Sequence, residues 1–393
     1  MRIAYFLTHP IQYQSPLIRH LRAGGMDVEV IYATDSTARA YRDAGFGTNV
    51  SWDIPLLEGY PHRVLFPGAS IPSGLGNYRR YLAALSAALD ELKPAAVWVH
   101  GWGNAYPLAA LRAARMKGLP VLMRGETSLD CLHGGRLRRG VHAVVLLRLF
   151  RSVSQFLAIG TANRKFYRHH GVPEERIHLM PYAVDNGFFQ QRCAGARPQR
   201  EKLRAELGIE PGRPVVLFCA KLIEVKDPGT LIRAIGRLGE LKPVLLLAGD
   251  GALRPELEKL AAEVASGLVK FLGFRNQTEL PALYDLCDVF VLPSIFEPWG
   301  LVVNEVMNAG KPVIVSDKIG CRHDLVKTGG NGDVFPAGDV GALTDRLELW
   351  LRDPGRRAAG GAESLRMITR WGFEQNLAGM QQALKQTTMA NGD

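Results

Sequence analysis

The sequence predicts an α/β protein with two domains, each a parallel β-sheet covered by helices on both faces. In the first half, short apolar runs such as 3–7 and 28–33 alternate with longer amphipathic segments, and the second half repeats this scheme. Strands that alternate with helices of roughly 10–15 residues are typical of βαβ units, in which the strands pair in parallel. A segment rich in Gly, Pro and charged residues, 186–213, separates the halves and is the expected linker.

Both halves supply several strands that read as buried on both faces. The expected strands of the first half are 3–7, 28–33, 95–100, 120–124 and 155–159, and the clearest helical patterns are 78–92 and 105–116. The expected strands of the second half are 215–219, 244–248, 269–271, 289–292 and 312–315, with helices at 228–238 and 280–286. We therefore expect two Rossmann-like domains, 1–185 and 214–371, that face each other across a cleft.

Composition bounds the class of protein. The chain has 393 residues, of which 47% are apolar and 22% charged, as in ordinary globular proteins. Its five cysteines include no CxxC pair, which favours free thiols in a reducing compartment over a zinc framework. No apolar run approaches the roughly 20 residues that span a bilayer. We expect a cytoplasmic protein, either soluble or peripheral on the inner face of the cell membrane.

The positive charge is concentrated in the first half. The net charge is +10; residues 1–190 hold 22 basic and 13 acidic side chains, whereas residues 191–393 hold 26 basic and 25 acidic ones. A basic domain predicts an anionic partner, such as lipid headgroups, a lipid-linked diphosphate, an acidic glycan or nucleic acid.

The segment 291–305 carries the most informative motif. A buried strand ends at 293, a loop carries Glu297, and a helix is expected to begin near Gly300 and Leu301. Free backbone N–H groups at a helix start bind anions, and Glu305 would lie roughly 8 Å further along that helix. This spacing fits a nucleotide sugar, with the diphosphate at the helix start, sugar hydroxyls on Glu297 and ribose hydroxyls on Glu305. From composition alone, Glu297 could instead cap the helix and Glu305 could lie on a solvated face.

In this strand–loop–helix setting, Glu297 and Glu305 with seven residues between them resemble the signature of retaining glycosyltransferase family 4, which has the GT-B fold. The segments 214–227, 248–256, 269–294 and 307–317 resemble the same family, closely over 214–350 and more loosely in the first half. The resemblance implies a metal-independent retaining enzyme of the bacterial surface-polysaccharide type. Enzymes of this family often follow a front-face path, in which the leaving phosphate takes the acceptor proton, and the resemblance implies the same path here.

Lys221 and Lys226 follow the first strand of the second half. Cations at a strand's carboxyl end can stabilise charge that grows on a leaving diphosphate. The resemblance implies that both hold the donor diphosphate, although the family usually has arginine at the first position, and a lysine lacks the bidentate fork. Two solvated surface lysines are the alternative.

Three further residues are expected near the donor. Gly249 lies in a tight loop after a buried strand, and Phe274 and Arg275 follow another. The resemblance implies that these loops approach the nucleotide base, through backbone atoms at Phe274 and Arg275.

Polar residues at strand ends of the first half are expected on the acceptor side. His9 and Gln12 follow the first strand, where many relatives have a glycine pair that this chain lacks. His100 and Trp102 end a later strand; a lone histidine there is as often structural as functional. The glycines on either side of Trp102, and Trp102 itself, favour a position of His100 in a cleft.

The next strand ends in Arg124 and Glu126. Glu126 takes the place where several relatives carry a cleft histidine, and we expect it to orient the acceptor hydroxyl. The alternative is a structural ion pair between these two side chains.

Two helices complete the prediction. The segment 136–151 is basic at both ends and apolar between, which fits either an interfacial element on anionic lipid or a helix packed on the sheet. The segment that begins at Trp371 resembles the family's C-terminal helix, which implies that about 372–393 crosses back onto the first domain.

The sequence therefore predicts a glycosyltransferase that uses a UDP- or GDP-sugar and a saccharide or lipid-linked acceptor, with no metal or other cofactor. The expected catalytic residues are Lys221, Lys226, Glu297, Glu126 and His100. A nucleotide-sugar-binding or regulatory protein of the same fold without turnover is the alternative. Nucleic-acid binding is not expected, because the basic segment lacks stacking aromatics. A dinucleotide dehydrogenase would need a GxGxxG after the first strand, and none is present.

Overall fold

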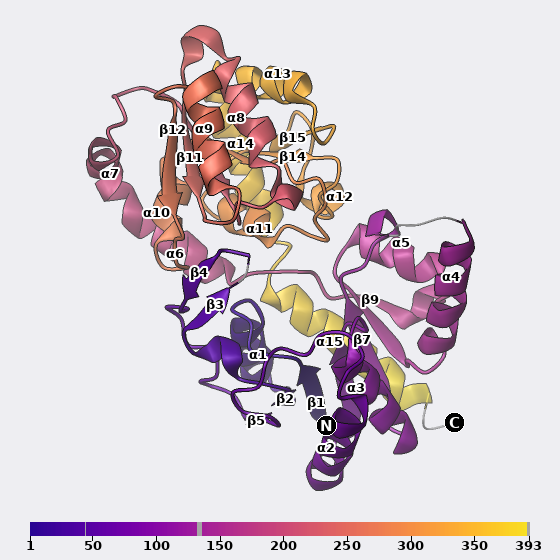
Figure 1. The fold of residues 1–393 in the computed structure, drawn as a ribbon. Helices are drawn as coiled ribbons and strands as arrows, with labels where there is room; N and C mark the ends of the chain where they lie inside the picture. Colours follow the sequence, from indigo (N-terminus) through magenta and orange to yellow (C-terminus); the bar gives the residue numbers. More distant parts are fainter. Residues whose placement is uncertain (44, 132–135, 391–393) are drawn as a thin grey trace. The chain divides into compact units, whose positions relative to one another are not determined.

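The computed structural model describes residues 1–43, 45–131 and 136–390, which form two compact units (Figure 1). Unit 1 comprises residues 1–41, 55–183 and the chain from 372 onward, and unit 2 comprises 42–54 and 184–371.

Unit 1 is a parallel sheet of seven described strands in the order β5-β2-β1-β6-β7-β8-β9. The strands are β1 (Arg2–Leu7), β2 (Asp27–Tyr32), β5 (His62–Val64), β6 (Ala96–His100), β7 (Val121–Gly125), β8 (Gln155–Ala158) and β9 (Ile177–Leu179). The helices are α1 (Gln14–Ala23), α2 (Tyr78–Leu92), α3 (Ala105–Met116), α4 (Arg136–Phe150), α5 (Thr161–His169) and α15 (Phe373–Ala390).

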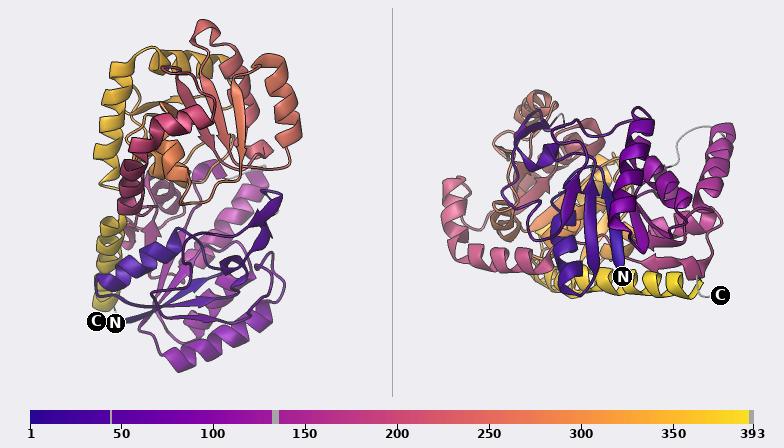
Figure 2. Two further views of the ribbon diagram at one scale, coloured as in Figure 1. Left: turned by 90° about the vertical axis from the view of Figure 1, so that its left-hand side faces the viewer. Right: turned by 90° about the horizontal axis from the view of Figure 1, so that it is seen from below.

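Each face of this sheet has its own apolar core. Side chains from α2, α3, α4 and α5 pack on one face, and side chains from α1 and α15 pack on the other. The C-terminal helix α15 lies along β8 and β9 (Figure 2). In the second core, Tyr5 and Trp98 stack from neighbouring strands with ring centroids 3.5 Å apart. The covered faces explain why these strands read as continuous apolar runs rather than alternating ones.

Unit 2 is a parallel sheet of six described strands in the order β12-β11-β10-β13-β14-β15. They are β10 (Val215–Cys219), β11 (Val244–Ala248), β12 (Val269–Gly273), β13 (Val289–Leu292), β14 (Val313–Ser316) and β15 (Gly332–Phe335). The helices are α6 (Asn186–Ala196), α7 (Arg200–Glu206), α8 (Pro228–Gly236), α9 (Arg254–Val264), α10 (Leu280–Leu286), α11 (Leu301–Met307), α12 (Arg322–Leu325), α13 (Val340–Leu351) and α14 (Pro354–Ile368). The strands β3 (Tyr41–Asp43) and β4 (Thr48–Val50) pair separately.

The predicted α/β class with two Rossmann-like sheets is confirmed. Two segments differ from the expected organisation: 42–54, from the first half, belongs to unit 2, and 186–213, expected as a linker, is largely helical and packs in unit 2. The strands β5, β9 and β15 escaped prediction because each is short and a polar residue interrupts its apolar pattern.

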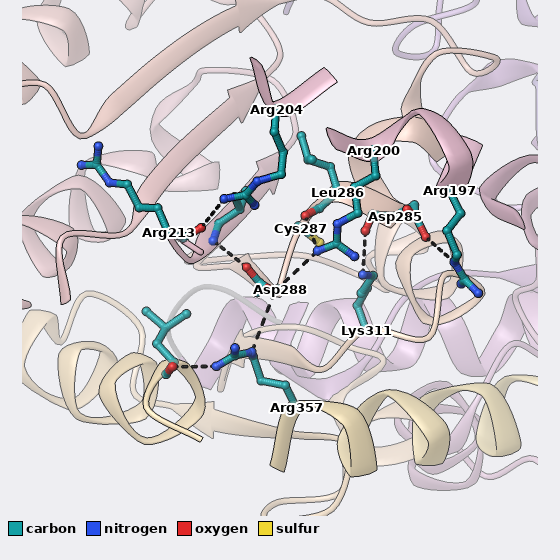
Figure 3. Close-up of polar contacts among 12 residues, drawn as sticks. Arg197, Arg200, Arg204, Arg213, Asp285, Leu286, Cys287, Asp288, Lys311 and Arg357 are labelled. Atoms are coloured by element: carbon teal, nitrogen blue, oxygen red, sulfur yellow. Dashed lines mark hydrogen bonds and ion pairs between the residues drawn. The ribbon is translucent and has the colours of Figure 1, made fainter. Parts of the chain in front are cut away.

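Ion pairs explain why the expected linker is ordered. Arg200 and Arg357 both approach Asp288, at 3.7 and 3.8 Å, and Arg197 lies 3.2 Å from Asp285 (Figure 3). Asp288 also accepts a 2.8 Å hydrogen bond from the backbone N of Val215, at the start of β10. Two of the arginines that make 197–213 look like a solvated linker, Arg197 and Arg200, are therefore paired with carboxylates 88 residues away, just before β13.

Two more expectations concern the described residues. The described side chains of Cys193, Cys219, Cys287 and Cys321 are free thiols, as expected. Among the helices that the structure describes, none is both long and apolar enough to cross a membrane.

Candidate functional site

The loops that follow β10 and β11 touch backbone to backbone at the carboxyl edge of the unit 2 sheet. A Cβ atom on Gly249 would lie 1.9 Å from the carbonyl oxygen of Ala220, and one on Gly251 would lie 2.4 Å from that of Leu222. Both glycines also have positive φ, at +147° and +159°. Glycine is therefore required at Gly249 for close packing of these loops, because any side chain would push them apart.

Lys226 and Glu297 meet at this edge. The Lys226 ammonium donates a hydrogen bond to the Glu297 carboxylate, and the two side chains are 19% and 17% exposed. Lys226 ends a short 3₁₀ turn, and the next residue, Asp227, caps α8 by accepting from the N–H of Thr230 at 3.3 Å. The structure thus brings together two predicted site residues that are 71 positions apart, and both stay reachable from solvent.

The Glu297 loop is fixed by its own backbone. The N–H of Glu297 donates to the carbonyl of Lys318 at 3.2 Å, and the carbonyl of Glu297 accepts from the N–H of Gly320 at 2.9 Å. Gly300, with φ +95°, then turns the chain into α11, which begins at Leu301. A Cβ on Gly300 would lie 3.1 Å from Ile319, so both conformation and space favour glycine.

Glu305 is buried beneath this edge, with 3% exposure. The hydroxyl of Tyr284, on α10, donates a 2.5 Å hydrogen bond to Glu305 Oε2. Burial raises the pKa of Glu305 to about 7, although the Tyr284 hydrogen bond opposes that rise. The alternative that Glu305 lies on a solvated helix face is therefore wrong.

Lys221 has a partner that the sequence did not indicate. Its Nζ lies 2.6 Å from Asp43 Oδ1 and 4.7 Å from the ring centroid of Phe46. The Phe46 ring in turn meets that of Phe274, with centroids 4.9 Å apart. Arg275 forms an i,i+4 ion pair at 3.0 Å with Glu279 instead of joining this group. The alternative of a solvated Lys221 does not hold.

In unit 1, a chain of hydrogen bonds links the strand ends of β1, β6 and β7. His100 Nε2 lies 3.2 Å from Glu126 Oε1, and the same oxygen accepts from the Tyr182 hydroxyl at 2.6 Å. The other ring nitrogen of His100, Nδ1, lies 3.2 Å from the hydroxyl of Tyr5, which donates to Gln14 at 3.1 Å. The structure thus brings together His100 and Glu126 and adds two tyrosines that the sequence did not single out.

The environment keeps Glu126 ionised. Burial alone would raise its pKa, but hydrogen bonds from His100 and Tyr182, together with the charge of Arg124, outweigh it and lower the pKa. The Glu126 side chain is 38% exposed, so this carboxylate can reach a ligand.

His9 and Gln12 lie between β1 and α1. Burial, with the nearby charge of His100, lowers the pKa of His9 to about 4, so this imidazole is neutral near pH 7. Its Nδ1 lies 2.8 Å from the Thr8 hydroxyl. Gln12 is half-buried in the turn before α1.

Arg124 belongs to the framework of unit 1, and its prediction as an acceptor contact needs correction; Trp102 is half-buried, and its place on the acceptor side stays a prediction. Arg124 is only 1% exposed, and its guanidinium donates to the carbonyls of Met180 and Pro181 and to Asn376 of α15. The guanidinium makes these contacts rather than the ion pair with Glu126 that the sequence left as the alternative. The indole of Trp102 packs on aromatic rings of α4 and α5, including a stack on Phe166 at 6.1 Å.

Among the described residues, no group of three or more His, Cys, Asp or Glu side chains is placed to hold a metal ion.

Two family models match the chain. The family described as "Glycosyl transferase 4-like domain" matches residues 10–183, and the one described as "Glycosyl transferases group 1" matches residues 199–366. Together these matches take in most of both units. Each half of the chain thus matches a glycosyltransferase family, and the fold is GT-B.

Solved structures share this fold. HepE of Anabaena, in complex with UDP, superposes with a TM-score of 0.74 at 20% identity and covers 98% of this chain and 100% of its own. Sucrose-phosphate synthase of Thermosynechococcus elongatus superposes with a TM-score of 0.72 at 19% identity, over 99% of this chain and 100% of its own. At such identities the likeness establishes the fold.

Curated relatives match part of the chain. Alpha-D-kanosaminyltransferase of Streptomyces kanamyceticus is 31% identical over 188 residues, which is 47% of each chain. The putative glycosyltransferase EpsF of Bacillus subtilis is 30% identical over 254 residues, 63% of this chain and 62% of its own. The chain thus spans about half to three-fifths of the length of the curated relatives it matches.

Proposed function

We propose that this glycosyltransferase moves a sugar from a nucleoside-diphosphate sugar to a saccharide or lipid-linked acceptor, with retention of configuration and without a metal ion. The observation that carries the proposal is the contact between Lys226 and Glu297 beside Gly300, at the carboxyl edge of the unit 2 sheet. In parallel α/β sheets, ligands bind at this edge. At this edge Lys226, a cation suited to the diphosphate, is hydrogen-bonded to Glu297, a carboxylate suited to the sugar hydroxyls.

The donor half of the reaction depends on the two lysines. When the bond between the anomeric carbon and the diphosphate oxygen breaks, negative charge grows on that oxygen. Lys226 and Lys221 are cations on the loop that follows β10, so they stabilise this charge where it develops. Glu297 then accepts hydrogen bonds from sugar hydroxyls, and the buried Glu305 serves the ribose hydroxyls through its carboxyl oxygens.

The acceptor half depends on unit 1. Glu126, ionised and partly exposed, accepts a hydrogen bond from the acceptor hydroxyl, while His100 and Tyr182 hold the carboxylate in one orientation. On the front-face path that the resemblance implies, the acceptor oxygen bonds to the anomeric carbon as the phosphate oxygen leaves and takes the acceptor proton. We keep UDP- and GDP-sugars as the candidate donors; the UDP complex of HepE, a protein of the same fold, supports trying UDP first.

We further propose that α4 meets an anionic membrane surface. The exposed apolar side chains Val141, Val144, Val145 and Leu147 have 40–60% exposure, and Arg148 on the same helix is also exposed. Exposed valines beside an arginine on one helix fit an interfacial element. Vesicle flotation, described below, tests this.

The donor proposal is tested by thermal shift with UDP, GDP, ADP and CMP, each with EDTA. We expect one nucleoside diphosphate to raise the melting temperature of the wild type and of Lys259→Ala, and to leave Lys226→Ala unchanged. Lys259 is an exposed lysine on α9, so it controls for loss of one positive charge. Equal stabilisation of both variants, or none of any protein, would contradict the proposal.

A further inference from the structure

The segment 42–54 crosses from the first half of the chain into unit 2 and reaches the predicted donor site. Within it, Asp43 is held by its own turn, because its Oδ1 accepts from the N–H of Gly45 at 2.8 Å and of Phe46 at 3.0 Å. The same oxygen receives the Lys221 ammonium at 2.6 Å. The carboxylate is therefore oriented by the backbone before it meets the lysine, and its side chain is 15% exposed.

The segment surrounds the head of Lys221. Besides Asp43, the Phe46 ring lies 4.7 Å from Nζ, and a Cβ on Gly45 would lie only 2.8 Å from Nζ. The backbone at Gly45 thus runs directly against the ammonium. A phosphate group can bind the Lys221 ammonium from this side only after the Asp43 carboxylate has moved away from it.

The far end of the segment is fastened to the loop after β12. Asp53 Oδ2 accepts from the backbone N–H of Thr278 at 3.0 Å, and Asn276 Nδ2 donates to the carbonyl of Ser51 at 2.6 Å. The ring of Trp52 meets that of Phe274 at 6.2 Å. The segment 42–54 is therefore held against the rest of unit 2 at both ends, by Asp43 on Lys221 and by the contacts of residues 51–53 with the loop after β12.

We propose that Asp43 is a specificity-determining residue of the donor site, whose carboxylate competes with the donor diphosphate for Lys221. This inference rests on the proposed function, which assigns Lys221 to the diphosphate. Two anions at one ammonium repel each other, so a ligand that brings a phosphate to Lys221 must displace Asp43. A ligand whose phosphates do not reach Lys221 leaves Asp43 in place and does not bear this cost. Asp43 therefore lowers the preference of the site for ligands that bring a diphosphate to Lys221.

The test is a double-mutant cycle on the full chain, with the affinities for UDP and GDP measured by calorimetry. Asp43→Asn keeps the size and the turn acceptor but removes the charge. We expect it to tighten binding of the preferred nucleotide about fivefold, the scale of a part-exposed ion pair. In the Lys221→Ala background, the same change should leave the affinity unchanged, because no lysine remains to compete for. Glu348→Gln, which removes an equal charge from an exposed pair with Arg352, should have no effect in either background.

The remaining outcomes distinguish failure of the Asp43 proposal from failure of the proposed donor site. If wild type binds a nucleotide and Asp43→Asn binds it equally or more weakly, Asp43 does not compete and the inference is overturned while the donor site stands. Equal tightening in the Lys221→Ala background would also overturn it, since the effect would not pass through the lysine. If neither wild type nor Asp43→Asn binds any nucleotide, the proposed function fails at its donor site, and the inference fails with it.

Discussion

At the scale of single residues, environment decides which carboxylate carries charge. Glu126 is held ionised by His100 and Tyr182, whereas Glu305 is buried with one hydroxyl donor and has a pKa raised to about 7. Two glutamates of one chain therefore differ in protonation near neutral pH. Burial without a cationic partner accounts for the difference, and the sequence alone gives no sign of it.

The raised pKa of Glu305 makes stability depend on pH. The folded state keeps this proton up to about pH 7, whereas the unfolded chain releases it near 4.5, so the folded state binds more protons in that window. The free energy of unfolding therefore falls as pH rises through the window, by up to about 3 kcal/mol. Glu305→Gln removes this dependence.

We expect the melting temperature of Glu305→Gln, relative to wild type, to increase steadily from about pH 5 to about pH 8. Scanning calorimetry at several pH values measures this, with the exposed Glu348→Gln as a control whose difference from wild type stays flat. A flat difference for Glu305→Gln as well would show that the Glu305 carboxyl is not protonated in the fold near neutral pH.

At the scale of elements, α4 presents apolar side chains that the rest of unit 1 does not cover. Val144 and Val145 are 51% and 57% exposed, near Arg148. Replacing both valines by aspartate removes apolar contact and adds repulsion from anionic lipid. We expect the double variant to reduce flotation with anionic vesicles by about tenfold.

The control for α4 is Val264→Asp, a 38% exposed valine at the end of α9 in unit 2. It should float as wild type does, and neutral vesicles should capture less of every protein. If wild type floats equally and negligibly with both vesicle types, the membrane proposal is contradicted. If the double variant floats as wild type does, α4 is not the element that contacts the membrane.

Elements with strong local signals were predictable from sequence, and those set by distant contacts were not. The apolar runs of β1, β10 and β13 and the loop with Glu297 lie where the sequence indicated. The helices of 186–206 were missed because their arginines look solvated until Asp285 and Asp288 are seen to pair with them.

The same reason explains the site residues that escaped prediction. Asp43 gains its role only through Lys221, 178 positions later, and Tyr284 only through Glu305. Arg124 was expected on the acceptor side because it ends a strand, but its side chain turns under the sheet toward Asn376 of α15.

At the scale of the whole molecule, the chain divides its chemistry between two units. Unit 2 holds the lysines and carboxylates assigned to the donor, and it is built from residues of both halves of the sequence. Unit 1 holds the ionised Glu126 and most of the excess positive charge, which lies within residues 1–190. The positive charge of unit 1, which we propose as the acceptor side, suits an anionic acceptor, and the attraction between them should weaken as salt increases.

The central claim is that a nucleoside-diphosphate sugar is bound and cleaved through Lys226 without a metal ion. The most direct measurement is the hydrolysis of UDP- and GDP-sugars in EDTA, in which water takes the sugar in place of the acceptor and nucleoside diphosphate is released, followed for wild type, Lys226→Ala and Lys259→Ala. We predict release by wild type and Lys259→Ala, and a rate lower by about a hundredfold or more in Lys226→Ala, the scale of losing one fixed transition-state charge. Release that requires added Mg²⁺, or that persists undiminished in Lys226→Ala, would contradict the account.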